Sequence, residues 1–179
     1  MTPVSASETT IYVAIDFETC GYAAHAACSV GLARIEGERI TATFYSLIRP
    51  PSSRILFSDI HGLTWPMLRE APFFVQVWQQ ALPLLADAHF FLAHNAAFDR
   101  RVLHAACRAA GLTPPSTPFL CTLKGARRCL PLPSKKLDMV CSHFGIDLEH
   151  HHAASDARAC AEVYLRLRDL GVADRQMAL

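Results

Sequence analysis

Two aspartates lie on the apolar faces of segments that have helical periodicity. At about 100° per residue, Asp99 falls on the apolar face of residues 96–110, and Asp156 falls on the apolar face of residues 153–170. A carboxylate that turns toward a protein core is unfavourable unless a cation or hydrogen bonds compensate its charge. The two aspartates therefore predict a site that neutralises buried negative charge.

A β-branched stretch near the N-terminus carries two more carboxylates. Residues 11–19 alternate as a strand does, which places Asp16 and Glu18 side by side on the face opposite the large apolar residues. Adjacent anions repel each other, and ions that prefer oxygen ligands, Mg²⁺ or Mn²⁺, would remove this repulsion for all four carboxylates. Taken singly, each residue is also compatible with an exposed acidic pair or a helix cap. Taken together, the four favour a metal site.

Three motifs that contain these carboxylates resemble those of the DEDDh 3′–5′ exonucleases. Asp16-Phe-Glu18-Thr19 resembles the first motif, His94-Asn95-Ala-Ala-Phe98-Asp99 the second, and His151-His-Ala-Ala-Ser-Asp156 the third, with its His-x4-Asp spacing. The motifs occur in family order, and the likeness runs from about residue 11 to residue 170. The chain resembles the exonuclease (epsilon) subunit of bacterial DNA polymerase III and its stand-alone relatives. Residues 20–28 depart from that subunit, because they replace its usual Thr-Gly turn.

The resemblance implies a reaction and a cofactor. It implies metal-dependent hydrolysis of phosphodiester bonds from a free, unpaired 3′ end, on DNA in the first instance, with release of nucleoside 5′-monophosphates. It also implies two ions per site, with Asp16 bridging both, Glu18 and Asp156 on the first, and Asp99 on the second, directly or through water. The alternatives are an exoribonuclease for short RNA and a non-catalytic nucleic-acid-binding or polymerase-binding module. The motifs do not separate DNA from RNA, since that choice depends on how a site treats the 2′-hydroxyl.

His151 is the predicted general base. An unperturbed imidazole pKa near 6.5 suits a group that takes a proton from water, and the family spacing to Asp156 selects His151 over the second choice, His152. The consecutive histidines 150–152 also suggest zinc. We expect no zinc site, because adjacent residues do not easily converge on one ion and no Cys or His at ligand spacing completes a set.

The resemblance further implies contacts with the terminal nucleotide. The residues at matching positions are Thr19, His61, Gly62, Leu63, Asn95 and Phe98. Leu63 would wedge against the last base and Phe98 would pack against its sugar or base, unless both residues simply fill the core. A set of cations could also follow the upstream phosphates, although a solvated basic face is the favoured interpretation. These cations are Lys124, Arg127 and Arg128 on one helix face, with Lys135 and Lys136 nearby.

Composition predicts one globular domain over residues 1–179, with flexible tails at 1–10 and 172–179. The 179 residues are 51% hydrophobic and 18% charged, and a net charge of +1 gives no overall basic field for nucleic acid. The seven scattered cysteines include no Cys-x-x-Cys pair, which favours a reduced, cytoplasmic setting. No apolar run is long enough for a membrane span. A polymerase or repair partner is compatible with the resemblance.

The pattern along the chain predicts an α/β protein with the RNase H-like fold, which has a five-stranded mixed sheet and helices on both sides. The expected strands are residues 11–19, 28–35, 40–48, 89–93 and 119–121. Helices are expected from Pro72 to about residue 86, at 96–110, around the basic residues after 121, at 135–144 and in the last segment. Residues 52–70 are expected to be irregular.

Overall fold

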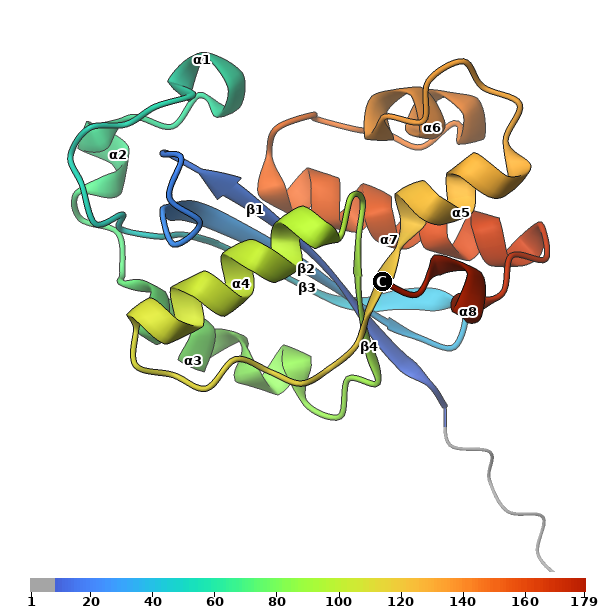
Figure 1. Ribbon diagram of the computed structural model, residues 1–179, viewed down its shortest axis with the longest axis horizontal. Coiled ribbons are helices and arrows are strands. Elements are labelled where there is room, and N and C mark those ends of the chain that lie inside the picture. The colour runs from blue at the N-terminus through green and yellow to red at the C-terminus, as the bar shows by residue number, and fades with distance from the viewer. Residues whose placement is uncertain (1–8) are drawn as a thin grey trace, which may run out of the picture.

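The computed structural model describes residues 9–179, which form a five-stranded sheet in the order β3-β2-β1-β4-β5 (Figure 1). The strands are β1 (Ile11–Thr19), β2 (Ala27–Glu36), β3 (Arg39–Leu47), β4 (Phe90–Ala93) and β5 (Phe119–Cys121). β1, β2 and β3 form an antiparallel meander, whereas β4 and β5 run parallel to β1. The carboxyl ends of three strands therefore meet at one edge of the sheet.

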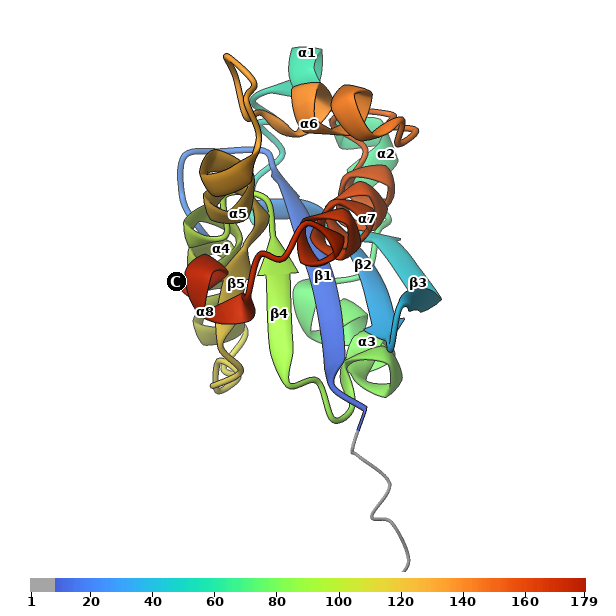
Figure 2. The same cartoon turned by 90° about the vertical axis from the view of Figure 1, so that its right-hand side faces the viewer.

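Helices cover both faces of this sheet. One core contains the larger apolar side chains of β1 together with α3 (Phe74–Leu85) and α4 (Ala97–Ala109). The other core contains Tyr12 and Ala14 of β1 together with the C-terminal helices. These are α5 (Thr122–Cys129), α6 (Leu137–Phe144), α7 (Ala153–Asp169) and α8 (Asp174–Met177). Figure 2 shows the strands between the two helical layers.

The alternation of β1 decides which side chains face each layer. Val13, Ile15 and Phe17 are at most 3% exposed and pack toward α3 and α4. Asp16 and Glu18 project from the other face, toward α7, as the period of two predicts.

Gly31 lets α7 approach the sheet closely. It pairs with Asp16 in the register of β1 and β2. A Cβ atom added at Gly31 would lie 2.0 Å from the carbonyl oxygen of Ala153, the first residue of α7. Only a residue without a side chain fits there, so the beginning of α7 sits directly beside the carboxylates of β1.

The predicted fold class is confirmed, and the strands lie within one residue of the expected positions. Two expectations about local order are corrected. The segment 52–70 contains two short helices, α1 (Ser58–His61) and α2 (Trp65–Leu68). Residues 172–179 are not a flexible tail, because α8 is packed and Met177 is fully buried. The predicted N-terminal tail lies almost wholly outside the described residues. Within 9–179, no helix combines the length and apolarity needed to cross a bilayer.

Candidate active site

Four carboxylates converge where β1 ends. Asp16 and Glu18 come from β1, while Asp99 and Asp156 come from the first turns of α4 and α7. Asp99 and Asp156 are 2% and 3% exposed, as the helical periodicity predicts. Carboxylate oxygens of Asp16, Glu18 and Asp156 all lie within 4.8 Å of one another.

Hydrogen bonds hold the two helical aspartates in place. Oδ1 of Asp99 accepts the backbone N–H of Phe17 at 3.1 Å, which ties α4 to β1. Oδ2 of Asp156 accepts the backbone N–H of His151 at 2.8 Å, and Oδ1 lies 3.2 Å from Nδ1 of His150. Each aspartate therefore keeps its orientation before any ligand binds.

The pKa values of three of the four carboxyls are raised, which indicates that the protein does not balance their negative charge. Burial, followed by the charges of the other three carboxylates, raises the pKa of Asp16 well above its ordinary value. Burial and the charges of Asp156 and Asp99 raise the pKa of Glu18 to about 8, and burial is the main cause that raises the pKa of Asp99 to about 7. Within residues 9–179, no lysine or arginine forms an ion pair with any of the four.

This donor set fits divalent cations. Closely spaced carboxylate oxygens that repel one another are the ligands that Mg²⁺ and Mn²⁺ prefer. These carboxylates are partly or fully buried, and no lysine or arginine of residues 9–179 pairs with them. A bound cation is therefore the simplest way to keep all four ionised together near neutral pH.

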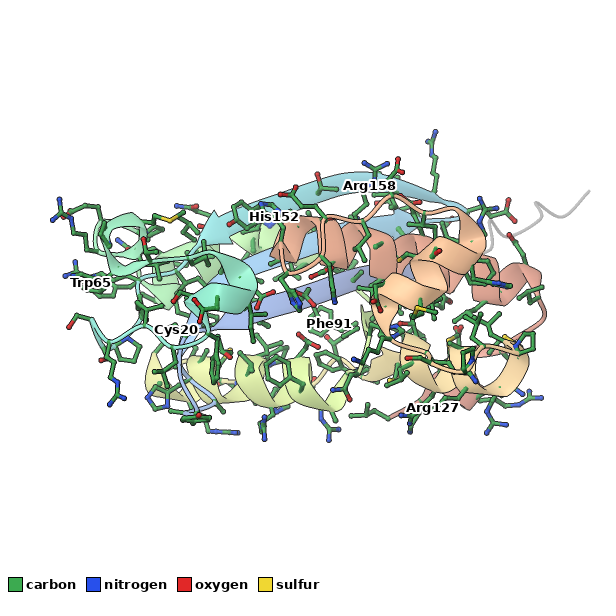
Figure 3. The ribbon with its side chains drawn as sticks, turned by 90° about the horizontal axis from the view of Figure 1, so that it is seen from above. Cys20, Trp65, Phe91, Arg127, His152 and Arg158 are labelled. Atoms are coloured by element: carbon green, nitrogen blue, oxygen red, sulfur yellow. The ribbon has the colours of Figure 1, made fainter. Side chains whose placement is uncertain are left out.

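The three consecutive histidines take different directions. The rings of His150 and His151 stack with their centroids 3.9 Å apart, and both residues line the cavity beside Asp156. His152 instead stacks on Tyr45 of β3 at 4.7 Å and faces a different cavity (Figure 3). The second choice for the base, His152, therefore lies away from the carboxylates. The expectation that these histidines do not converge is wrong for two of them, because His150, His151 and Asp156 have donor atoms within 4.8 Å of one another.

A cavity of about 1020 Å³ opens beside the carboxylates. Its lining includes Asp16, Glu18 and Asp156 together with the His150–His151 pair, while Asp99 lies behind them. α5 and the segment before α6 also line it and contribute three cationic residues, Arg127, Lys135 and Lys136, with Asp138 of α6 beside them. Arg127 is labelled on α5 in Figure 3. Lys124 lies elsewhere, since its Nζ donates to the carbonyl oxygen of Ala178 at 2.7 Å.

The predicted nucleotide contacts separate into two groups. Asn95 and Phe98 line the cavity, and Thr19 ends β1 next to it. The other three belong to the α1 region. His61 and Gly62 lie at the end of α1, and Leu63 is 7% exposed in an apolar cluster with Cys20, Cys28 and Leu68. For Leu63, core filling is the role that this packing supports.

His94 is a site residue for which the sequence indicated no role. Its Nε2 lies 2.7 Å from the carbonyl oxygen of Lys135, and its Nδ1 lies 2.9 Å from Oγ1 of Thr122. Because a carbonyl only accepts, Nε2 donates and Nδ1 accepts from the Thr122 hydroxyl. Burial lowers the pKa of His94, in keeping with this neutral bridge. The bridge joins the end of β4 to α5 and to the segment before α6. The only sign of this role in the sequence is that His94 directly precedes Asn95.

Sheet order and carboxylate cluster together define an RNase H-like α/β protein, and comparison with known sequences gives the family. Residues 13–164 match the family model described as "RNase_T: Exonuclease". DNA polymerase III subunit epsilon of Pasteurella multocida is 31% identical over 93% of this chain and 71% of that protein. DNA polymerase III PolC-type of Thermotoga maritima is 33% identical over 89% of this chain, which spans only 12% of that relative. The chain belongs to this exonuclease family.

Solved structures show the same fold. Exonuclease X in complex with 5′ overhanging duplex DNA superposes with a TM-score of 0.73 at 24% identity, covering 93% of this chain and 97% of that one. The nuclease domain of 3′hExo, a DEDDh family member bound to rAMP, gives a TM-score of 0.77 at 19% identity, with coverage of 93% and 96%. The predicted family resemblance and the exonuclease class of enzyme are thus confirmed.

Proposed function

We propose that this chain is a metal-dependent 3′–5′ exonuclease that releases nucleoside 5′-monophosphates from a free 3′ end, most readily on DNA. The observation that carries the proposal is the convergence of Asp16, Glu18, Asp99 and Asp156, with which no lysine or arginine of residues 9–179 forms an ion pair. Membership of the exonuclease family supplies the class of reaction.

The four carboxylates would hold two Mg²⁺ or Mn²⁺ ions, as the DEDDh resemblance implies. Bound divalent ions lower the pKa of an attacking water and stabilise negative charge on the phosphoryl and leaving oxygens. Asp99 and Asp156 keep their orientation through the N–H groups of Phe17 and His151, so the ligand set is preorganised.

His151 would accept the proton of the attacking water. Burial and the neighbouring His150 lower its pKa, so its imidazole is neutral and able to accept a proton at neutral pH. Its backbone N–H is fixed on Asp156, and its ring lies against that of His150. Both contacts support a fixed position for the base beside the carboxylates.

The cavity suits one unpaired strand end. Arg127, Lys135 and Lys136, which line the same cavity as the carboxylates, would bind phosphates, and Phe98 offers an aromatic face for a sugar or base. Asn95 would hydrogen-bond the terminal nucleotide. Thr19, His61 and Gly62 would complete that contact from the β1 and α1 side. A polymerase or repair protein is the proposed partner, in line with the names of the relatives.

Digestion of three 3′-labelled substrates tests the proposal: single-stranded DNA, duplex DNA and short RNA. We expect mononucleotides from the 3′ end in Mg²⁺ or Mn²⁺, no product in excess chelator, and recovery when the metal is restored. Faster digestion of RNA than of DNA would support an exoribonuclease. Products from the 5′ end, or full activity in chelator, would reject the proposal. Nucleic-acid binding without hydrolysis would support the non-catalytic module.

A further inference from the structure

A second set of donor atoms adjoins the four carboxylates and differs from them in chemistry. It consists of the imidazoles of His150 and His151 and the carboxylate of Asp156, all with donor atoms within 4.8 Å of one another. The oxygen-rich cluster suits Mg²⁺. Two imidazoles and one carboxylate are instead the ligand types of a zinc site that keeps a fourth position for water.

The backbone explains how the imidazoles of two adjacent histidines lie on the same side of the chain, although these nearly parallel rings must rotate before both lone pairs face one ion. Successive side chains of an extended segment point in opposite directions, which is the objection to adjacent ligands. His151 has a φ of 68°, in the left-handed region, and this local turn brings its ring onto that of His150 with a centroid separation of 3.9 Å and an interplanar angle of 22°. The turn is held by hydrogen bonds from the His151 N–H to Asp156 (2.8 Å) and from the Glu149 N–H to Oγ of Ser155 (2.8 Å).

One donor spacing of the set fits the size of the ion. With Zn–N and Zn–O bonds of about 2.0–2.2 Å, neighbouring ligand atoms of a tetrahedral site lie roughly 3.3–3.5 Å apart. Nδ1 of His150 and Oδ1 of Asp156 are 3.2 Å apart. An ion bound between them would replace their hydrogen bond. The His150 side chain is 37% exposed, which leaves a path from solvent.

We propose that His150, His151 and Asp156 form a binding site for Zn²⁺, and that an ion bound there inhibits the enzyme. The binding half of this inference stands by itself, while the inhibition rests on the proposed function. Zinc on the His151 ring would occupy the lone pair that accepts the proton from water, and zinc on Asp156 would compete with its role in the carboxylate set. Mg²⁺, which prefers oxygen ligands, leaves both imidazoles free. The identity of the ion would thus determine whether the base is available.

Direct binding measurements test the site without any use of activity. We would titrate the metal-free full chain with Zn²⁺ by calorimetry in buffers of different ionisation enthalpy, and with Co²⁺ by visible absorption. We expect binding at this site and a Co²⁺ spectrum without thiolate bands. His150→Ala should weaken Zn²⁺ binding by at least about 10-fold, since even groups that only orient metal ligands contribute 10–100-fold. His152→Ala is the matched control, because that ring stacks on Tyr45, and it should bind Zn²⁺ like the unmodified chain.

Three outcomes would overturn the site: no Zn²⁺ binding, thiolate bands with Co²⁺, or equal Zn²⁺ affinity in the unmodified chain and His150→Ala. A thermal melt of each variant shows that it is folded. Inhibition is then measured as the Zn²⁺ concentration that halves each variant's own Mg²⁺-supported activity. That concentration should rise at least about 10-fold in His150→Ala, in step with its affinity. Unchanged inhibition would reject the inhibitory role. Zinc binding by a chain with no nuclease activity would instead reject the proposed function and leave the site standing.

Discussion

Asp99 and Asp156 are predictable from sequence because each breaks an otherwise apolar helical face. The structure buries both and brings them to the carboxylates of β1. A buried carboxylate that only stabilised the fold would have a cationic or multiply donating partner. Backbone hydrogen bonds, above all that from the Phe17 N–H, lower the pKa of Asp99, yet burial still raises it to about 7. For Asp99, this imbalance is what a purely structural carboxylate would not be expected to have.

Asp16→Asn should separate turnover from folding. The amide keeps the shape of the side chain but removes one of four repelling charges, so the metal-free melting temperature should be equal or higher. Turnover should fall by at least about 100-fold, the scale of losing one group that stabilises transition-state charge. Asp147→Asn, an exposed acid outside the cavity, is the control in both thermal melts and steady-state assays. A large loss of metal-free stability in Asp16→Asn would show that Asp16 is a structural residue.

His151→Ala should reduce kcat by roughly 10²–10⁴-fold, the usual contribution of a general base, with little change in Mg²⁺ affinity. Because the base must be neutral, activity of the unmodified enzyme should rise with pH. The lowered pKa of His151 puts the midpoint of this rise below the ordinary histidine value of 6.5. The rise should vanish in the variant. A pH–rate profile at saturating Mg²⁺ measures both effects.

His152→Ala is the matched comparison, since its ring stacks on Tyr45 and faces away from the carboxylates. If His152→Ala is the inactive variant and His151→Ala is near normal, the assignment of the third motif is off by one residue. If neither loses more than a few-fold, the attacking water needs no protein base.

At the scale of elements, periodic segments were predictable and contact-dependent ones were not. The strand at residues 11–19 matches its prediction at both ends, because its alternation is a local property. α1 and α2 have four residues each, too few for a periodic signal, and α1 begins after Phe57 at a φ of 64°. α8 is held by Asp174, whose carboxylate accepts hydrogen bonds from the hydroxyls of Tyr12 (2.7 Å) and Tyr164 (2.9 Å). A bond across 162 residues of sequence leaves no local pattern.

The same reasoning explains what was predicted of the site. Strand alternation and charge on apolar helical faces predicted the carboxylates, because both patterns are visible in the sequence. The family spacing to Asp156 selected His151, whose role as base stays a prediction. The bridge from His94 to Thr122 and Lys135 was missed, since it joins three segments that only the fold brings together. The convergence of His150 with His151 was missed for a different reason. It depends on one positive φ angle at a non-glycine residue, which sequence rarely reveals.

Gly31→Ala should disturb the contact between β2 and α7 and, through it, the site. The new Cβ would lie 2.0 Å from the carbonyl oxygen of Ala153, so the first turn of α7 must move. Overpacking of this kind costs about 1–3 kcal/mol or more, and the same turn carries Asp156. We expect a lower melting temperature and lower kcat together. Gly21→Ala is a matched control, since its Cβ would meet only the Cβ of Ala26, at 3.3 Å. Equal behaviour of the two variants would show that the close approach at Gly31 is unimportant.

At the scale of the whole molecule, the fold concentrates negative charge in a chain that is nearly neutral. The net charge is +1, yet four carboxylates from β1, α4 and α7 meet at one end of the sheet. Three cationic residues line the same cavity, with Asp138 beside them. A substrate phosphate in this cavity would meet those cationic side chains as well as bound ions. Local charge, and not the overall field, is therefore the basis expected for nucleic-acid binding.

The unbalanced cluster makes the stability of the whole domain depend on pH and metal. In the folded, metal-free protein the pKa of Glu18 is about 8 instead of 4.5 and that of Asp99 about 7 instead of 3.8. Between their unfolded and folded pKa values these two carboxyls bind more protons in the folded state, so their contribution to stability falls as pH rises. The loss begins near pH 4 and is complete only above about pH 8. His61, His94, His104 and His151, whose pKa values burial lowers, act in the opposite direction.

Thermal melts of the metal-free protein at pH 6 and pH 8 test this dependence. For a domain of this size, each 1 kcal/mol lowers the melting temperature by roughly 2–4 °C, so a fall of several degrees is expected at pH 8. Saturating Mg²⁺ should remove most of that fall, since an ion that binds ionised carboxylates stabilises the folded state most where those groups are deprotonated. Glu18→Gln should flatten the metal-free dependence and weaken the response to Mg²⁺, whereas Asp147→Asn should leave both unchanged. A metal-free pH dependence that Glu18→Gln leaves unchanged would mean that the carboxylates are already compensated within the protein, and the case for a metal site at this position would fail.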